Sequence, residues 1–118
     1  MSPAYDRARL VELFGDNEAT LAEIEREFLE TAWSVQTEIR AAEDLETIAR
    51  AAHRLKGASG MIGAAALGRI ADAVERAALA GDLPAVLGLD GALAQEVAKV
   101  TAQAGADQAR GLSITVAE

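Results

Sequence analysis

Apolar residues recur along this chain with the period of an α-helix rather than with the alternation of a β-strand. Two segments show the pattern best, residues 17–42 and 64–80, where an apolar position returns every three or four residues. In the first segment the stripe consists of Leu21, Ile24, Phe28, Ala32, Val35, Ile39 and Ala42. This spacing puts the apolar side chains on one face, so both segments are predicted to be amphipathic helices packed on a shared core.

Polar and glycine-containing breaks divide the chain into further helices. Asp44 is suited to cap a helix that ends near Gly63, because its side chain can accept a hydrogen bond from the first helical turn. Gly81, Asp82 and Pro84 are typical of a helix end, an N-cap and a first-turn proline. We therefore expect helices over about residues 3–14, 17–42, 44–63, 64–80 and 82–104.

The short connections between these helices favour antiparallel neighbours. The predicted fold class is all-α, an up-down antiparallel four-helix bundle with a short extra N-terminal helix. A chain of 118 residues suits a single domain, which we place at residues 1–105. The remaining residues, 106–118, show no helical period and are expected to form a loosely ordered C-terminal tail.

Composition and charge narrow the class of protein. The sequence contains no Cys, which excludes disulfides and thiolate metal sites. Its formal net charge of −8 argues against general binding to nucleic acid, because phosphate backbones are met by clustered Lys and Arg. The sequence shows neither a signal-peptide pattern nor an apolar run of membrane-spanning length, so we expect a cytoplasmic protein with no membrane partner.

The single histidine lies in a segment whose charge is opposite to that of the whole chain. Residues 47–71 contain no Asp or Glu but four cationic side chains, those of Arg50, Arg54, Lys56 and Arg69. At about 100° per residue, the positions within about 60° of His53 include Ala49, Arg50, Lys56, Gly57 and Gly60. The opposite face is predicted to be core and carries Ile48, Ala52, Leu55, Ser59 and Ile62. The imidazole is therefore expected to point into solvent, beside a lysine and two glycines.

This combination of side chains favours phosphoryl transfer. A neutral imidazole has a ring nitrogen whose lone pair can attack an electrophile, and Lys56 supplies donors for phosphoryl oxygens. Inside a helix, Gly57 and Gly60 each lower stability by about 1 kcal/mol relative to alanine. On an exposed face, such a cost indicates that another molecule approaches the bare backbone closely. One histidine without cysteine makes a zinc site improbable, and the glycine spacing fits neither G-x-G-x-x-G nor the P-loop.

The run AHRLKGASGMIGAAALGRIADAVERAA, residues 52–78, resembles the histidine-containing phosphotransfer (HPt) domain. The positions that match its motif are His53, Leu55, Lys56, Gly57, Ser59, Gly63, Ala64 and Glu75. The resemblance implies a four-helix bundle in which His53 accepts a phosphoryl group from a receiver-domain aspartate and passes it to another receiver. It also implies that Lys56 steadies the phosphoryl oxygens, that Gly57 permits close docking, and that Glu75 accepts a hydrogen bond from the other imidazole nitrogen. Glutamine is often found at that last position.

The expected role is that of a phosphocarrier without its own ATP site or kinase activity. We expect docking at Ala49, Arg50, Gly57 and Gly60, and no cofactor or metal bound by this chain, with Mg²⁺ in the receiver partner. The expected partners are response-regulator receiver domains, with a hybrid sensor kinase as a further candidate, and the chain is expected to be a monomer. Two alternatives stay open at this point: a helical adaptor or dimerisation module without chemistry, and an HPt-like inhibitor that occupies the docking surface of a kinase.

Overall fold

Helices dominate the fold. The computed structural model describes the backbone of residues 3–117 and the side chains of residues 3–109. In chain order the elements are α1 (Arg7–Phe14), α2 (Glu18–Ala41), α3 (Leu45–Ile62), α4 (Ala65–Leu79), α5 (Leu83–Gly88) and α6 (Asp90–Ala117). The described residues contain no strand, which confirms the prediction of an all-α protein.

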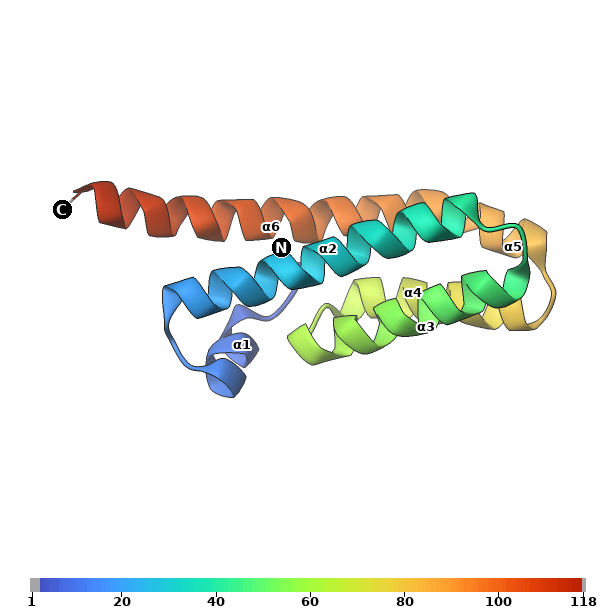
Figure 1. Ribbon diagram of the computed structural model, residues 1–118, viewed down its shortest axis with the longest axis horizontal. Coiled ribbons are helices and arrows are strands. Elements are labelled where there is room, and N and C mark those ends of the chain that lie inside the picture. Colours follow the sequence, from blue (N-terminus) through green and yellow to red (C-terminus); the bar gives the residue numbers. More distant parts are fainter. Residues whose placement is uncertain (1–2, 118) are drawn as a thin grey trace.

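Four of these helices form a closed ring of neighbours. α2 contacts α3 and α6, and α4 also contacts α3 and α6. In Figure 1, α2 and α6 run along the length of the molecule above α3 and α4, and the short helices α1 and α5 lie toward opposite ends. The most extensive packing joins α3 and α4, so side chains from these two helices lie close together.

Side-chain caps begin the helices where the sequence predicts them. Asn17, Asp44 and Asp82 each accept a hydrogen bond from the backbone N–H three residues further on, at 3.0, 2.7 and 3.0 Å. α1 begins later than expected, at Arg7, because Asp6 is its N-cap and accepts a hydrogen bond from the first turn. The starts of α1, α2, α3 and α5, which have side-chain caps, are therefore local properties of the sequence.

The last two helices differ from the prediction. The single helix expected over about 82–104 is divided at Leu89, between Gly88 and Gly91, two residues of low helix propensity. The expected end near Ala104 is wrong, because α6 continues to Ala117 through most of the expected tail. Within this continuation Asp107 contacts the hydroxyl of Tyr5, a polar contact that a count of apolar positions does not reveal. Over the described residues, none of the helices combines the length and apolar character needed to cross a membrane.

Polar side chains attach the N-terminal segment to α2 and α6. Tyr5 is 2% exposed, and its hydroxyl contacts the carboxylates of Glu25 on α2 and Asp107 on α6. Gln103 accepts hydrogen bonds from the backbone N–H groups of residues 4 and 5, at 2.6 and 3.3 Å, and Arg7 donates to Glu25 at 3.2 Å. Burial is the main reason that the pKa of Glu25 is raised. We call these five residues, Tyr5, Arg7, Glu25, Gln103 and Asp107, the Tyr5 cluster.

Small residues let α3 and α4 approach each other closely. The predicted core face of α3 is confirmed, because its members Ile48, Ala52, Leu55, Ser59 and Ile62 are all buried. On the facing helix, a Cβ added to Gly68 would stand 3.5 Å from the Cβ of Ser59. Because so little side-chain volume separates the helices, longer polar side chains on α4 can reach those on α3.

The turn between α3 and α4 requires a glycine. Gly63 has φ 70°, in the left-handed region, and its backbone N–H and that of Ala64 both donate to the carbonyl of Ser59. A Cβ on Gly63 would also lie 2.8 Å from the Cβ of Asp6 at the start of α1. The motif glycine therefore ends α3 and leaves room for the N-terminal segment.

Candidate functional site

His53 lies on the exposed face of α3 and is held by a carboxylate of α4. Its side chain is 71% exposed, and its Nδ1 is 2.7 Å from Oε2 of Glu75. An ionised carboxylate can only accept a hydrogen bond, so this contact requires a proton on Nδ1. In the neutral ring the lone pair then lies on Nε2, on a side chain that is largely open to solvent.

The ionisation of Glu75 is favoured by the same contacts. The hydrogen bond from Lys56 is the largest cause that lowers the pKa of Glu75, and the hydrogen bond from His53 also lowers it. Glu75 occupies the position that the HPt resemblance implies for it. The structure therefore places the three side chains that the sequence singled out for chemistry in one connected group.

Lys56 bridges two carboxylates of α4. Its Nζ lies 3.0 Å from Oε1 of Glu75 and 3.0 Å from Oδ1 of Asp72. Both hydrogen bonds raise the pKa of Lys56, and the one to Glu75 is the larger cause. The side chain is therefore an ammonium. The other oxygen of Asp72 is 3.0 Å from Nε of Arg76, and the hydrogen bond from Lys56 is the main reason that the pKa of Asp72 is lowered.

Asp72 is a site residue that the sequence reasoning missed. It precedes Glu75 by three positions, the spacing at which two side chains share one face of a helix. That spacing is the signal by which it could have been found.

Three of the four cations in the segment around His53 are paired with carboxylates in the folded chain. Arg50 pairs with Glu46 at 3.3 Å, and Arg54 pairs with Glu38 of α2 at 2.7 Å. Together with the contacts of Lys56, these ion pairs offset most of the positive charge of the segment. The acidic partners come from a preceding turn and from other helices, which a count within residues 47–71 leaves out.

Gly57 and Gly60 form an open strip of backbone beside the imidazole. Both are exposed, and a Cβ added to either would meet nothing within 4 Å. Their location agrees with the predicted helix face. Neither glycine is needed for packing inside this chain, so the space above them is available to another molecule.

Ala49 does not lie where the helix face predicts it. It is only 6% exposed and belongs to a buried cluster that includes Val74 and Ala78 of α4. The angular position of a residue on its own helix does not show how much of that helix a neighbouring helix covers. The close approach of α4 covers Ala49. The expected position of Ala49 on the exposed face is therefore wrong.

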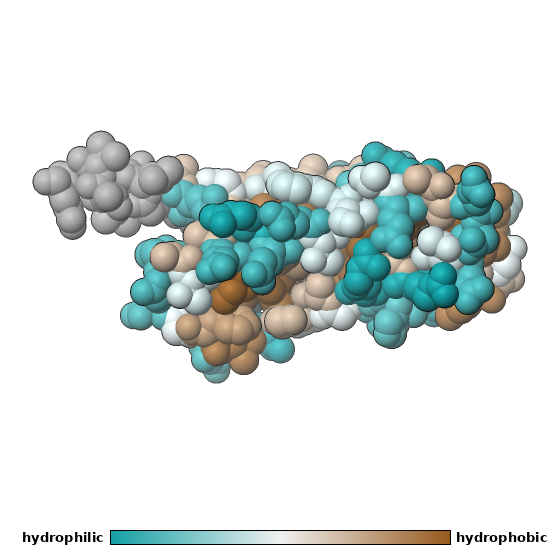
Figure 2. Space-filling view, in the orientation of Figure 1, coloured by the Kyte–Doolittle hydropathy of each residue, from teal (hydrophilic) through white to brown (hydrophobic). Residues whose placement is uncertain are grey.

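Apolar side chains border the open strip at its far end. Figure 2 shows hydrophobic atoms gathered over α1, where Val11, Leu13 and Phe14 are exposed. Met61, which follows Gly60, is 53% exposed, and its carbonyl accepts a hydrogen bond from Arg9 of α1 at 3.1 Å. The exposed face near His53 thus combines polar, bare-backbone and apolar surface.

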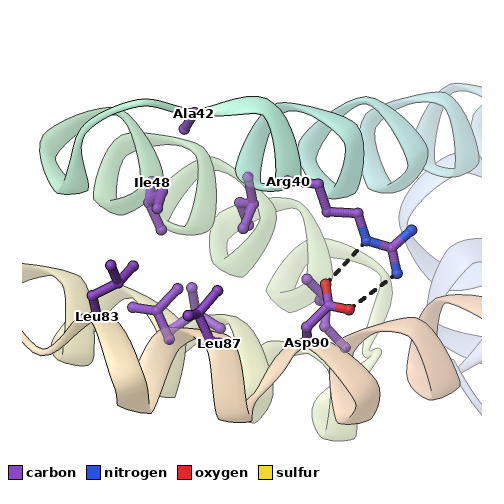
Figure 3. Close-up of a pocket in the computed structure, with 10 residues that line it drawn as sticks. Arg40, Ala42, Ile48, Leu83, Leu87 and Asp90 are labelled. Carbon is purple, nitrogen blue, oxygen red and sulfur yellow. Dashed lines mark hydrogen bonds and ion pairs between the residues drawn. The ribbon is translucent and has the colours of Figure 1, made fainter.

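A separate cavity lies away from the histidine site, near α5. It has a volume of about 380 Å³ and is lined mainly by apolar side chains, among them Ile48, Leu83 and Leu87 (Figure 3). Arg40 and Asp90 close one side of it through two hydrogen bonds of 3.0 and 3.3 Å. None of His53, Lys56, Asp72 and Glu75 lines this cavity.

Fold and site together define an all-helical protein with a solvent-facing histidine oriented by a carboxylate of the adjacent helix. A family model described as the Hpt domain matches residues 10–103. The chain therefore belongs to the Hpt domain family, whose members carry phosphoryl groups in two-component phosphorelays and interact with receiver domains. No curated protein matches the chain, and no solved structure does.

Proposed function

We propose that His53 accepts a phosphoryl group from the aspartyl phosphate of a receiver domain and passes it to the aspartate of another. The observation that carries this proposal is the 2.7 Å contact between His53 Nδ1 and Glu75 Oε2. It selects the tautomer in which Nε2 is the nucleophile, on an exposed side chain. Membership of the Hpt family supports the same role.

The transfer step follows from this geometry. The Nε2 lone pair attacks phosphorus, the bond between phosphorus and the aspartyl oxygen breaks, and its electron pair returns to the receiver carboxylate. The imidazole ring then bears a positive charge with a proton on Nδ1, and the Glu75 carboxylate lies against that proton. Onward transfer is the reverse step with a second receiver, so one residue orients the ring in both directions.

The neighbouring residues assist without forming bonds to phosphorus. Lys56 stabilises the phosphoryl oxygens by charge and hydrogen bonding. Gly57 and Gly60 let the receiver approach the ring closely, and Arg50 contributes a polar contact at the edge of the docking surface. The receiver supplies Mg²⁺ and its own acidic residues, and this chain binds no cofactor and does not phosphorylate itself from ATP.

The scaffold for this role is the ring formed by α2, α3, α4 and α6, which we interpret as an up-down antiparallel four-helix bundle. The pairwise contacts between consecutive long helices support this interpretation. The protein works in the cytoplasm as a monomer, with receiver domains, including one carried by a hybrid sensor kinase, as its partners.

The experiment is transfer of labelled phosphate from a phosphorylated receiver domain. Wild-type chain is expected to acquire label that is stable in base and lost in acid, whereas His53→Gln acquires none and keeps its helical circular dichroism spectrum. Label that remains on His53→Gln would contradict the proposal. Binding of the receiver without any labelling of the wild type would favour the non-catalytic adaptor instead.

A further inference from the structure

Lys56 is already paired with carboxylates before any phosphoryl group arrives. Two cations, Lys56 and Arg76, are paired with two carboxylates, Asp72 and Glu75, through contacts of 3.0 Å each. Arg69 lines the same surface pocket as Lys56 and Asp72 and is a further cation there. A phosphoryl group adds a charge of about −1.5 to −2 near neutral pH. Phosphorylation of His53 would therefore bring a new negative charge beside two carboxylates that already hold Lys56.

The hydrogen-bond donors of Lys56 are largely in use as well. An ammonium has three N–H donors, and two of them are directed at Asp72 and Glu75. A phosphoryl group on His53 competes with these carboxylates for the same cation. Asp72 and the phosphoryl oxygens are thus rival acceptors.

We propose that Asp72 is a positioning residue that competes with the phosphoryl group for Lys56, destabilises phosphorylated His53 and so favours onward transfer to a receiver. This inference rests on the proposed function of His53. It concerns how firmly the carrier holds its phosphoryl group, because destabilised phosphohistidine favours release to a receiver and disfavours acceptance from one.

Asp72 can be tested apart from the imidazole. Glu75 contacts both Lys56 and His53, so a change there alters the orientation of the ring. Asp72 instead contacts Lys56 and Arg76 on a surface that is partly open to solvent, with its side chain 34% exposed. Because Asp72 contacts neither His53 nor Glu75, its replacement is expected to leave the contact between them in place.

The experiment uses phosphoramidate as a donor, which requires no receiver. The bond between phosphorus and the amino nitrogen breaks, ammonia leaves with the electron pair, and a bond forms between phosphorus and His53 Nε2. At fixed phosphoramidate and ammonia concentrations, phosphorus NMR gives the ratio of phosphorylated to free His53. In Asp72→Asn this ratio is expected to rise about 3- to 10-fold, the effect of one unit charge a few ångström away in a solvated site.

Three further comparisons separate competition from a structural effect. Asp72→Glu keeps the charge and is expected to keep a ratio near that of the wild type. In the Lys56→Gln background the rise caused by Asp72→Asn is expected to shrink to less than half, because the cation for which the groups compete is gone. Glu23→Gln, which removes one negative charge from an exposed position of α2, is the matched control and is expected to leave the ratio unchanged.

The outcomes distinguish this inference from the proposed function. An unchanged or lower ratio in Asp72→Asn, or an equal rise with and without Lys56, would overturn the competition while leaving His53 as the carrier. A wild-type chain that forms no phosphohistidine with phosphoramidate or with a phosphorylated receiver would overturn both.

Discussion

Oε2 of Glu75 lies 2.7 Å from Nδ1 of His53, although the two residues are 22 positions apart in the chain. The contact joins the middle of α3 to the C-terminal half of α4, and it decides which imidazole nitrogen carries the proton. In the proposed transfer the nucleophile is the other nitrogen, so the chemistry of an exposed residue on one helix would depend on the packing of the next.

Replacement of Glu75 tests this dependence. Glu75→Ala is expected to slow phosphoryl transfer about 10- to 100-fold, the usual scale for the loss of a residue that orients a reactive histidine. Glu75→Gln keeps an acceptor oxygen for Nδ1–H and is expected to keep most of the rate. Transfer kinetics and the nitrogen chemical shifts of the imidazole measure rate and tautomer together. Equal rates for wild type and Glu75→Ala would show that the ring needs no orientation.

Removal of the ammonium is expected to affect transfer far more than folding. Lys56→Ala deletes a charge-stabilising donor next to the phosphoryl oxygens, so transfer is expected to slow about 10- to 1000-fold. The side chain is 42% exposed, and the melting temperature is expected to change little. Rapid-quench transfer assays and thermal melts check the two effects, and a wild-type rate would leave Lys56 as an ordinary surface charge.

Gly57 separates the requirements of docking from those of folding. A Cβ at this position meets nothing within 4 Å, and glutamine is the better helix former, so Gly57→Gln is expected to stabilise the fold by up to about 1 kcal/mol. The same side chain would stand in the path of the receiver, and transfer is expected to fall steeply. Denaturant unfolding and transfer rates on this variant give both numbers. A well-folded Gly57→Gln that transfers at the normal rate would place the docking surface elsewhere.

The Tyr5 cluster predicts a pH dependence of stability that is independent of the histidine. Burial raises the pKa of Glu25 above its ordinary value of 4.5. The folded state therefore binds the proton of Glu25 more tightly than the unfolded state does. The stability that this proton contributes is present below the ordinary pKa and is lost as pH rises through the pKa of the folded state. Glu25→Gln keeps an acceptor for Tyr5 and Arg7 but does not titrate.

Chemical unfolding across a pH series tests this sign. The free energy of unfolding of the wild type, relative to that of Glu25→Gln, is expected to fall as pH rises above 4.5 and to level off above the folded pKa. A difference that grows with pH over that interval would mean that the ion pair with Arg7 outweighs burial. His53→Gln is expected to leave the slope in this interval unchanged, because His53 lies outside the Tyr5 cluster.

Much of the site follows from the sequence alone, because the helical repeat is a local property. His53, Lys56, Gly57 and Gly60 share one face of α3 wherever that helix is placed, and their spacing suffices to put an imidazole, an ammonium and bare backbone together. The caps are equally local, since Asp44 needs only the backbone N–H three residues away.

The tertiary structure decided what surrounds that face. Small residues between α3 and α4 bring Asp72 and Glu75 to Lys56 and also bury Ala49, and neither result can be read from the angle around a single helix. Ion pairs with α2 and α4 offset the charges of Arg54 and Lys56 in a segment that is strongly positive when it is counted alone. Contacts between charges on different helices, and the burial of residues between them, depend on the distance between the helix axes. That distance is set by the packing of the whole bundle. Only the folded chain therefore shows that one carboxylate orients His53 while a second carboxylate holds the neighbouring lysine.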